Sequence, residues 1–267
     1  MAEQLKHVAD LVDEGGVQDN TLIFEHLWGL LGEVKEKVAR RLATTLDAGG
    51  DDFVSWDAPS GQKVRIEVSS GPEVDWMVHS WMGQPEMGFS NMHLTVWLGP
   101  HIAVPHLGLA WGTIPDVWFY CDVIPRSDLW TDLGALDRYY GPLNERWLDV
   151  REQHPELRVF TSRSLYVRSA LSEVAYVYTS DRSSEIISLM RDLVHERVDQ
   201  WLAWVDEAPS VPTAERPALA ARDLAIRRNI AERDPANVLG VRFFGEEMTE
   251  RLVRTLWGGD RVSPRPG

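Results

Sequence analysis

The spacing of hydrophobic positions changes twice along the chain, and each spacing predicts a different kind of element. Between residues 20 and 46, apolar side chains recur at intervals of three and four residues: Leu27, Leu31, Val34, Val38 and Leu42. This spacing predicts an amphipathic helix, with Asn20 as its N-terminal cap. The pair Gly49-Gly50 ends the pattern, so the helix is expected to stop before it.

From residue 52 to residue 125 the apolar residues form short runs rich in β-branched and aromatic side chains. Six runs follow one another: VSW, KVRIEV, VDWMVHSWM, NMHLTVWL, VPHLGLAW and VWFYCDVI. Glycine and proline residues between the runs are typical of tight turns. Because antiparallel neighbours can be joined by short turns, the six runs predict an antiparallel meander.

The rest of the chain is mostly helical in pattern. The apolar spacing predicts a helix over residues 183–206 and, after a Pro-rich linker, two more over residues 217–234 and 244–257. It also predicts a helix over residues 132–150, which Gly141-Pro142 interrupts. Residues 165–178 fit a strand, a helix or one of each. This order predicts an α+β fold, a three-layer α/β/α sandwich with a central antiparallel sheet. We expect one domain over residues 1–267, with flexible ends at 1–19 and 258–267.

Composition narrows the class of protein. The net charge of −14 argues against nucleic acid as a partner, because a phosphate backbone selects basic surfaces. The single cysteine, Cys121, lies in an apolar run, so it predicts a buried residue and leaves no Cys-based metal site. No apolar run is long enough for a membrane span, and the first residues lack the apolar core of a signal peptide. We therefore expect a cytoplasmic protein without a membrane partner.

Familiar cofactor and hydrolase motifs are missing from the sequence. There is no glycine-rich nucleotide fingerprint, and no serine lies in a GxSxG elbow. His79, His93, His101 and His106 fall close together, but none has metal-ligand spacing, so isolated histidines are favoured over a metal site. An oxidoreductase with this sequence would depend on an external electron donor.

Two segments carry a resemblance to a known family. Residues 105–140 read PHLGLAWGTIPDVWFYCDVIPRSDLWTDLGALDRYY, and residues 221–257 contain a helix-like stretch, Phe244-Gly245 and a last amphipathic helix. Together they resemble the red chlorophyll catabolite reductases and, more distantly, the ferredoxin-dependent bilin reductases. The resemblance implies the sandwich fold, no bound cofactor, a conjugated tetrapyrrole as substrate and a carrier such as ferredoxin as electron donor.

The resemblance also implies functional positions, and several are occupied by unexpected residues. Ala110 stands where the family carries a strand acid, Arg65 stands where a family strand often carries a histidine, and Asn229 takes the functional position of the last helices. The nearest replacements for the acid are His106, His93 and Asp122, of which a histidine has a pKa near neutrality. In the alternative, Asp122 has only a structural role and holds the end of its strand.

Strand alternation and side-chain chemistry complete the predicted site. His106 and Ala110 fall on one face of their strand, with Gly108 between them, and the small residues Gly108 and Ala110 would leave room for a ligand. Arg65 or Arg168 could bind a substrate carboxylate, although a surface salt bridge is the simpler reading of each. We expect one pocket formed by the strands around residues 65, 93 and 106–110 and capped by the helix that carries Asn229.

The sequence leaves three functions open. The leading one is a cofactor-free reductase of a linear tetrapyrrole or other conjugated substrate, supplied with electrons by a small carrier protein. The second is a non-redox enzyme on the same scaffold that acts on a smaller aromatic or polyene acid, and the third is a non-catalytic ligand-binding protein. Two sets of arginines could attract an acidic carrier or simply be solvated: Arg216, Arg222, Arg227, Arg228 and Arg233, and Arg254, Arg261 and Arg265.

Overall fold

The computed structural model describes residues 6–114 and 116–259 and has one antiparallel sheet at its centre. The five long strands are β3 (Lys63–Ser70), β4 (Val74–Gln84), β5 (Phe89–Leu98), β6 (His106–Ile114) and β7 (Asp116–Ile124). They pair in sequence order, and β9 (Tyr176–Ser180) and β8 (Arg158–Val159) extend the sheet beyond β7. β1 (Thr45–Leu46) and β2 (Trp56–Asp57) both pair with β3.

The meander predicted from the apolar runs is confirmed from β3 to β7. Each neighbouring pair is antiparallel and is joined by a short connection. The first predicted strand is reduced to the two residues of β2, because residues 48–53 before it form a 3₁₀ helix, η1 (Ala48–Phe53).

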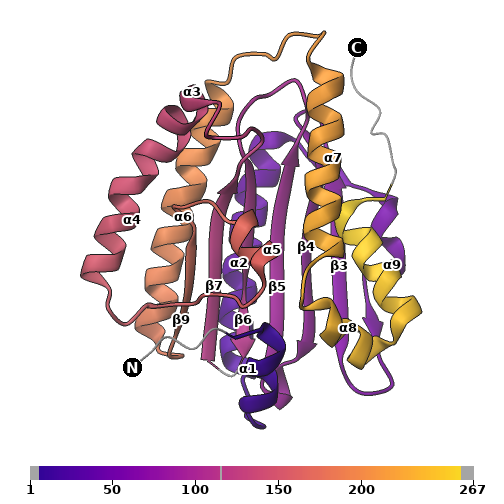
Figure 1. Ribbon diagram of the computed structural model, residues 1–267. Coiled ribbons are helices and arrows are strands. Elements are labelled where there is room, and N and C mark those ends of the chain that lie inside the picture. Colours follow the sequence, from indigo (N-terminus) through magenta and orange to yellow (C-terminus); the bar gives the residue numbers. More distant parts are fainter. Residues whose placement is uncertain (1–5, 115, 260–267) are drawn as a thin grey trace.

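The face of the sheet that points away from the viewer in Figure 1 carries the larger apolar core. Helices α2 (Thr21–Leu42), α6 (Ser184–Asp206) and α4 (Gly141–Gln153) contribute to it. The inward residues of α2 are Leu27, Leu30, Leu31, Val34, Val38 and Leu42, which confirms the predicted periodicity. Leu107, Leu109 and Trp111 of β6 point to this side, as alternation along a strand requires.

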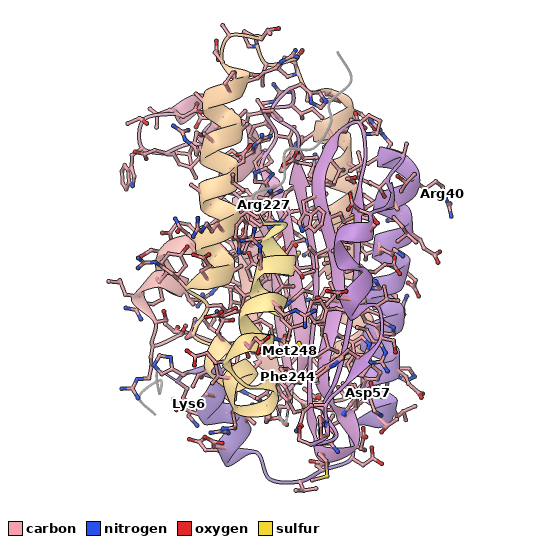
Figure 2. All side chains as sticks on the ribbon, turned by 90° about the vertical axis from the view of Figure 1, so that its right-hand side faces the viewer. Lys6, Arg40, Asp57, Arg227, Phe244 and Met248 are labelled. Atoms are coloured by element: carbon pink, nitrogen blue, oxygen red, sulfur yellow. The ribbon has the colours of Figure 1, made fainter. Side chains whose placement is uncertain are left out.

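The opposite face is covered by a second set of helices. They are α7 (Arg216–Glu232), α8 (Asn237–Phe244), α9 (Glu246–Trp257) and the six-residue α5 (Leu165–Ala170), all in front of the sheet in Figure 1. Figure 2, viewed edge-on, places α7 and α9 on one side of the sheet and α2 on the other. Helices thus cover both faces, which confirms the predicted three-layer sandwich.

Three details differ from the sequence prediction or resolve it. Gly141-Pro142 begins α4 and does not break it, because proline is tolerated in the first turn of a helix. Two short elements lead into α4: α3 (Leu133–Ala135) and then a π-helical turn, η3 (Leu136–Tyr140). Residues 165–178 hold one helix and the start of one strand. Part of the expected flexible N-terminal end forms α1 (Val8–Glu14), and residues 260–267 lie outside the described residues. No described helix is long and apolar enough to cross a membrane.

Candidate functional site

The middle of the sheet lacks bulk on the face covered by α7. Here β6 presents Gly108, Ala110 and Gly112 in succession, because its large residues alternate toward α2 and α6. Ala110 pairs with His93 on β5 and with Tyr120 on β7. We call the three small residues and their direct partners on β5 and β7 the central strip: Asn91, His93, Thr95, Gly108, Ala110, Gly112, Trp118, Tyr120 and Asp122.

Side chains of the central strip and its neighbours carry buried polar atoms that find no partner among the described residues. Ser80 on β4 pairs with His93 and is 1% exposed, yet its Oγ has no hydrogen-bond partner among the described residues. The buried atoms Asn91 Oδ1 and Trp118 Nε1 also lack partners within the described chain. A buried polar atom without a partner costs about 1–3 kcal/mol. Three of them around a row of small residues therefore mark a surface suited to a polar, flat ligand.

The titratable groups of the central strip have strongly altered pKa values. Burial lowers the pKa of His93 to about 4, so His93 is neutral at pH 7. Burial raises the pKa of Asp122 to about 6 against the opposing effect of hydrogen bonds from Ser172. Asp122 is fully buried and accepts from the Ser172 backbone N–H at 2.9 Å, from the Ser172 hydroxyl and from the Val123 N–H at 2.8 Å. Asp122 therefore has a raised pKa, and its contacts with Ser172 tie the end of β7 to the segment before β9.

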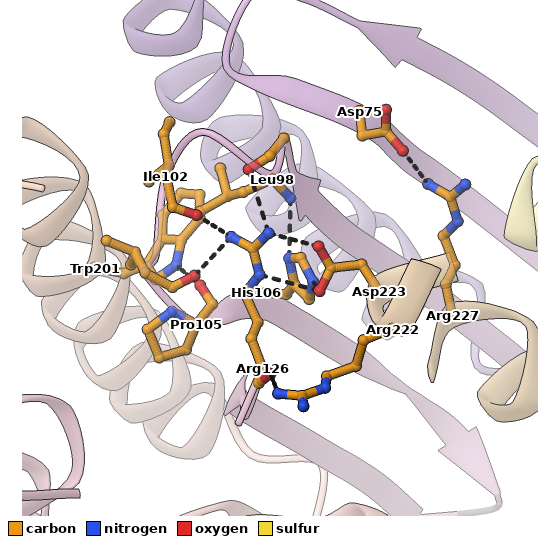
Figure 3. Close-up of polar contacts among 12 residues, drawn as sticks. Asp75, Leu98, Ile102, Pro105, His106, Arg126, Trp201, Arg222, Asp223 and Arg227 are labelled. Carbon is orange, nitrogen blue, oxygen red and sulfur yellow. Dashed lines mark hydrogen bonds and ion pairs between the residues drawn. The ribbon is translucent and has the colours of Figure 1, made fainter. Parts of the chain in front are cut away.

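A buried polar network fixes α7 to the end of the sheet, as Figure 3 shows. Asp223 of α7 binds Arg126 through two contacts, Nε to Oδ1 at 3.1 Å and Nη2 to Oδ2 at 2.5 Å. Arg126 also donates to the carbonyl oxygens of Gly99, Ile102 and Val104. The network therefore satisfies a buried guanidinium almost entirely within the protein.

His106 belongs to this network. Its Nδ1 accepts from the Leu98 N–H at 3.0 Å, and its Nε2 lies 3.2 Å from Oδ1 of Asp223. The ring is 0% exposed, and burial lowers its pKa to about 4. These contacts make His106 a neutral side chain that packs α7 on the sheet, which corrects the expectation that it lines an open pocket and donates a proton.

Other predicted site residues are only partly brought together. Arg65 lies on the opposite face: it pairs with Trp81 and stacks over its ring, and Trp81 belongs to the core beneath α2. The prediction of one pocket that includes Arg65 is therefore wrong. Arg168 is exposed on α5 and donates to the Ser162 carbonyl at 2.7 Å. Asn229 is exposed on α7, the helix that covers the face of His106 and the central strip.

The predicted basic sets are also resolved in part. Arg227 is buried and its Nη1 lies 3.1 Å from Oδ2 of Asp75, so it belongs to the interior and cannot attract a carrier at the surface. Arg228 pairs with Glu232, and Arg233 stacks over Tyr166. Arg261 and Arg265 lie outside the described residues.

Two acids of the α7 side were not predicted as site residues. Asp223 could not be recognised, because its partner Arg126 lies 97 residues away in sequence. Asp234 lies on the loop between α7 and α8, and burial raises its pKa although the Ala236 N–H donates to it at 2.8 Å. The Asp-Pro pair at 234–235, directly after a helical pattern, is a signal that could have drawn attention to this loop.

A small cavity lies beside the Arg126 network rather than on the central strip. It measures about 150 Å³ and includes Arg126, Ser127, Tyr139, Leu219 and Arg222 in its lining. Neither His106 nor Asn229 lines it. Among the described residues, no group of three or more histidine, cysteine, aspartate or glutamate side chains could hold a metal ion.

Comparisons with known proteins identify relatives of this chain in sequence and in fold. A family model described as red chlorophyll catabolite reductase matches residues 26–257. The chain is 32% identical to the red chlorophyll catabolite reductase of Arabidopsis thaliana over 228 residues, which cover 77% of this chain and 70% of the relative. It is 28% identical to the barley (Hordeum vulgare) enzyme of the same name over 143 residues, 49% of this chain and 69% of the relative.

A solved structure supports the fold independently. The crystal structure of tomato phytochromobilin synthase in complex with biliverdin superimposes with a TM-score of 0.74, covering 86% of this chain and 82% of that one. The sequence identity is 13%, so this likeness supports the fold alone. The family model covers most of the chain, and the resemblance found in residues 105–140 and 221–257 is therefore confirmed: the chain belongs to the red chlorophyll catabolite reductase family.

Proposed function

We propose that this protein reduces a linear tetrapyrrole that binds on the central strip, with electrons supplied by a small ferredoxin-type carrier. The observation that carries the proposal is the row of small residues on β6, bordered by unpartnered polar atoms, in a chain of this family. Asn91, His93, Trp118 and Tyr120 are partly exposed, so the strip is open to a ligand. A flat conjugated molecule fits such a surface, with a few polar groups to fix its orientation.

The reaction adds two electrons and two protons to one double bond of the conjugated system. The carrier delivers the electrons one at a time, and the protein supplies the protons. Asp122 is our first candidate for the proton source, because its pKa of about 6 keeps a fraction of the side chain protonated at neutral pH. Asp234 is the second, because burial raises its pKa on the helical side of the site.

The unpartnered atoms would hold the ligand. Trp118 Nε1 is a donor suited to a carbonyl oxygen, Asn91 Oδ1 is an acceptor suited to a pyrrole N–H, and the Ser80 hydroxyl can do either. Arg168 is exposed on α5 and remains a candidate for a propionate carboxylate. The roles of Trp118, Asn91 and Ser80 follow from hydrogen-bonding atoms that have no partner among the described residues.

The carrier would approach the basic surface of α7. Arg228 and Arg233 are exposed there, and they would offset locally the net charge of −14. If this surface docks an acidic carrier, the turnover rate falls as salt rises, because screening weakens long-range attraction. Arg233→Glu should lower the rate at low salt and have little effect at high salt. A rate that depends neither on salt nor on this substitution would contradict docking at this surface.

The proposal is tested by mixing the purified protein with biliverdin, or with red chlorophyll catabolite, and a reduced ferredoxin system while the visible spectrum is followed. A shifted spectrum on binding and loss of the conjugated band on reduction support it. Asp122→Asn and Asp234→Asn should each retain binding, and the variant that lacks the proton source should lose about 10²–10⁴-fold in turnover.

The two other functions predict different outcomes of the same experiment. Binding without turnover by the wild type, with every candidate donor supplied, favours a ligand-binding protein. No spectral change with any linear tetrapyrrole contradicts the proposal and favours a smaller substrate.

A further inference from the structure

Tyr120 has an unusual position in the central strip. It lies on β7 and pairs with Ala110, and its side chain leans toward the neighbouring Gly108. A Cβ placed on Gly108 would lie 3.0 Å from the Tyr120 hydroxyl oxygen and 3.3 Å from its ring. Any side chain at position 108 would therefore press on the phenol, so Gly108 and Tyr120 form a matched pair.

The surroundings of Tyr120 leave its hydroxyl uncommitted. Its charged neighbour Asp122 already accepts hydrogen bonds from Ser172 and Val123. Among the described residues, no hydrogen bond to the Tyr120 hydroxyl is formed, and the side chain is partly exposed on the strip. Burial and the Asp122 charge raise the pKa of Tyr120 well above 10, so the phenol keeps its proton at neutral pH and is a constant donor.

We propose that Tyr120 is a specificity-determining residue that donates a hydrogen bond to a carbonyl oxygen of the ligand on the central strip. This inference rests on the proposed function, because it assigns one polar contact within that binding site. Linear tetrapyrroles of the biliverdin type end in lactam rings, each with a carbonyl oxygen conjugated to the rest of the system. A donor beside Gly108 selects for that oxygen and sets which end of the chromophore lies over β6 and β7.

The role of Gly108 follows from the same geometry. Its missing side chain lets the hydroxyl of Tyr120 lie over β6, where a ligand on the small residues would meet it. Gly108→Ala would push the phenol away, because its new methyl group would also meet Ile124 Cδ1 at 3.0 Å and cannot escape in that direction. Gly108→Ala and Tyr120→Phe should therefore change ligand recognition in the same sense by independent routes.

A matched control lies on the other face of the sheet. Tyr178 on β9 is 2% exposed, its hydroxyl also lacks a hydrogen-bond partner among the described residues, and its ring packs in the core beneath α2 and α6. Tyr178→Phe also removes a tyrosine hydroxyl from the sheet, but on the face opposite the central strip. It controls for any general effect of removing a phenol oxygen.

The experiment compares wild type, Tyr120→Phe, Gly108→Ala and Tyr178→Phe by absorbance titration with two probes, biliverdin and its bis-O-methyl lactim ether, which lacks both lactam carbonyls. Wild type and Tyr178→Phe should prefer biliverdin. Tyr120→Phe should weaken biliverdin binding by about 3–10-fold, the effect of one hydrogen bond, and bind both probes equally.

The outcomes separate this inference from the proposed function. If Tyr120→Phe and wild type bind biliverdin equally and with the same preference over the ether, the role of Tyr120 is overturned and the proposed function stands. If wild type binds neither probe, the proposed function fails, and the inference fails with it. Gly108→Ala should reduce the preference for biliverdin over the ether, as Tyr120→Phe does. If a folded Gly108→Ala protein keeps the wild-type preference, the matched pair of Gly108 and Tyr120 is overturned.

Discussion

The two faces of the sheet are built on different physical principles. Beneath α2 and α6, the sheet presents Leu94, Leu107, Leu109 and Trp111, which pack into a continuous core that excludes water. Beneath α7, the central strip presents glycine, alanine and buried polar atoms without partners among the described residues, and an ion pair between Arg126 and Asp223 lies beside it. The first face carries the larger core, whereas the second has a smaller core of its own between β3 to β5 and helices α7 to α9 and gives up packing only at the central strip.

This difference explains how one strand can serve both purposes. Between residues 107 and 112 of β6, alternation sends Leu107, Leu109 and Trp111 to the first face and Gly108, Ala110 and Gly112 to the second. On this stretch of β6, core residues and candidate ligand-binding residues therefore alternate. Substitutions on the two faces should have opposite patterns of effect, and four measurements can break or sharpen the comparison.

The largest effect is expected from the ion pair that anchors α7. Asp223→Ala leaves the guanidinium of Arg126 buried with only carbonyl partners and removes the contact to His106. We expect a loss of about 3–5 kcal/mol in the free energy of unfolding, measured by urea denaturation. The double variant Arg126→Met/Asp223→Leu should recover much of this loss. A single variant as stable as wild type would show that α7 is held by its other contacts.

A substitution on the first face should cost stability but not recognition. Leu109 is 0% exposed and packs in the core beneath α2 and α6. Leu109→Ala should lower the free energy of unfolding by about 2–5 kcal/mol, through lost burial and the cavity left behind. At a temperature where the variant is folded, its ligand affinity should equal that of wild type. A parallel loss of affinity would contradict the separation of the faces.

The pH dependence of stability tests the buried histidine of the second face. The pKa of His106 is about 4 in the folded protein and about 6.5 in an ordinary setting. Between these values the unfolded chain binds the proton and the folded protein does not. Stability is therefore complete above pH 6.5 and falls as pH falls toward 4, by about 3 kcal/mol at most from this residue.

Asp122 acts in the opposite direction over part of the same window. Its folded pKa is raised from 3.8 to about 6, so its unfavourable burial is relieved as pH falls from 6 toward 4. Urea denaturation at pH 7, 5.5 and 4.5 measures the sum. His106→Gln should reduce the loss on acidification, whereas Asp122→Asn should increase it. If neither variant changes the slope, these two groups do not set the acid sensitivity.

The smallest effect is expected at Ser80. Its hydroxyl is buried without a partner among the described residues, so Ser80→Ala should leave stability unchanged or raise it by about 1 kcal/mol. The same change should weaken ligand binding by about 0.5–1.5 kcal/mol, measured by absorbance titration. A stability loss with unchanged affinity would mean that the hydroxyl serves the fold.

Much of the fold could be predicted because its signals are local. Three- and four-residue spacing located α2 and α6, and short β-rich runs located β3 to β7. Alternation also placed His106 and Ala110 on one face, since both lie on the same strand. For residues on different strands, the face depends on pairing register, which cannot be inferred from the local pattern of apolar residues. Arg65 was therefore assigned to a pocket on the wrong side of the sheet.

The site was less predictable because its contacts join distant segments. The role of His106 depends on Asp223 of α7 and on the Leu98 amide, and neither could be inferred from the residues around it. Asn229 was chosen by position, while Asp234, a few residues further on, carries the raised pKa. Burial decides which of several acids is altered, and burial is known only once the helices have been placed.

The most direct test of the account is to fill the central strip. Ala110 is 7% exposed, between His93 and Tyr120. We predict that Ala110→Phe folds as wild type by far-UV circular dichroism but loses at least about 10²-fold in affinity for biliverdin, because its ring occupies the space of the ligand. Wild type should bind with a saturable change in its visible spectrum. Equal affinity of a folded Ala110→Phe protein and wild type would contradict the location of the site.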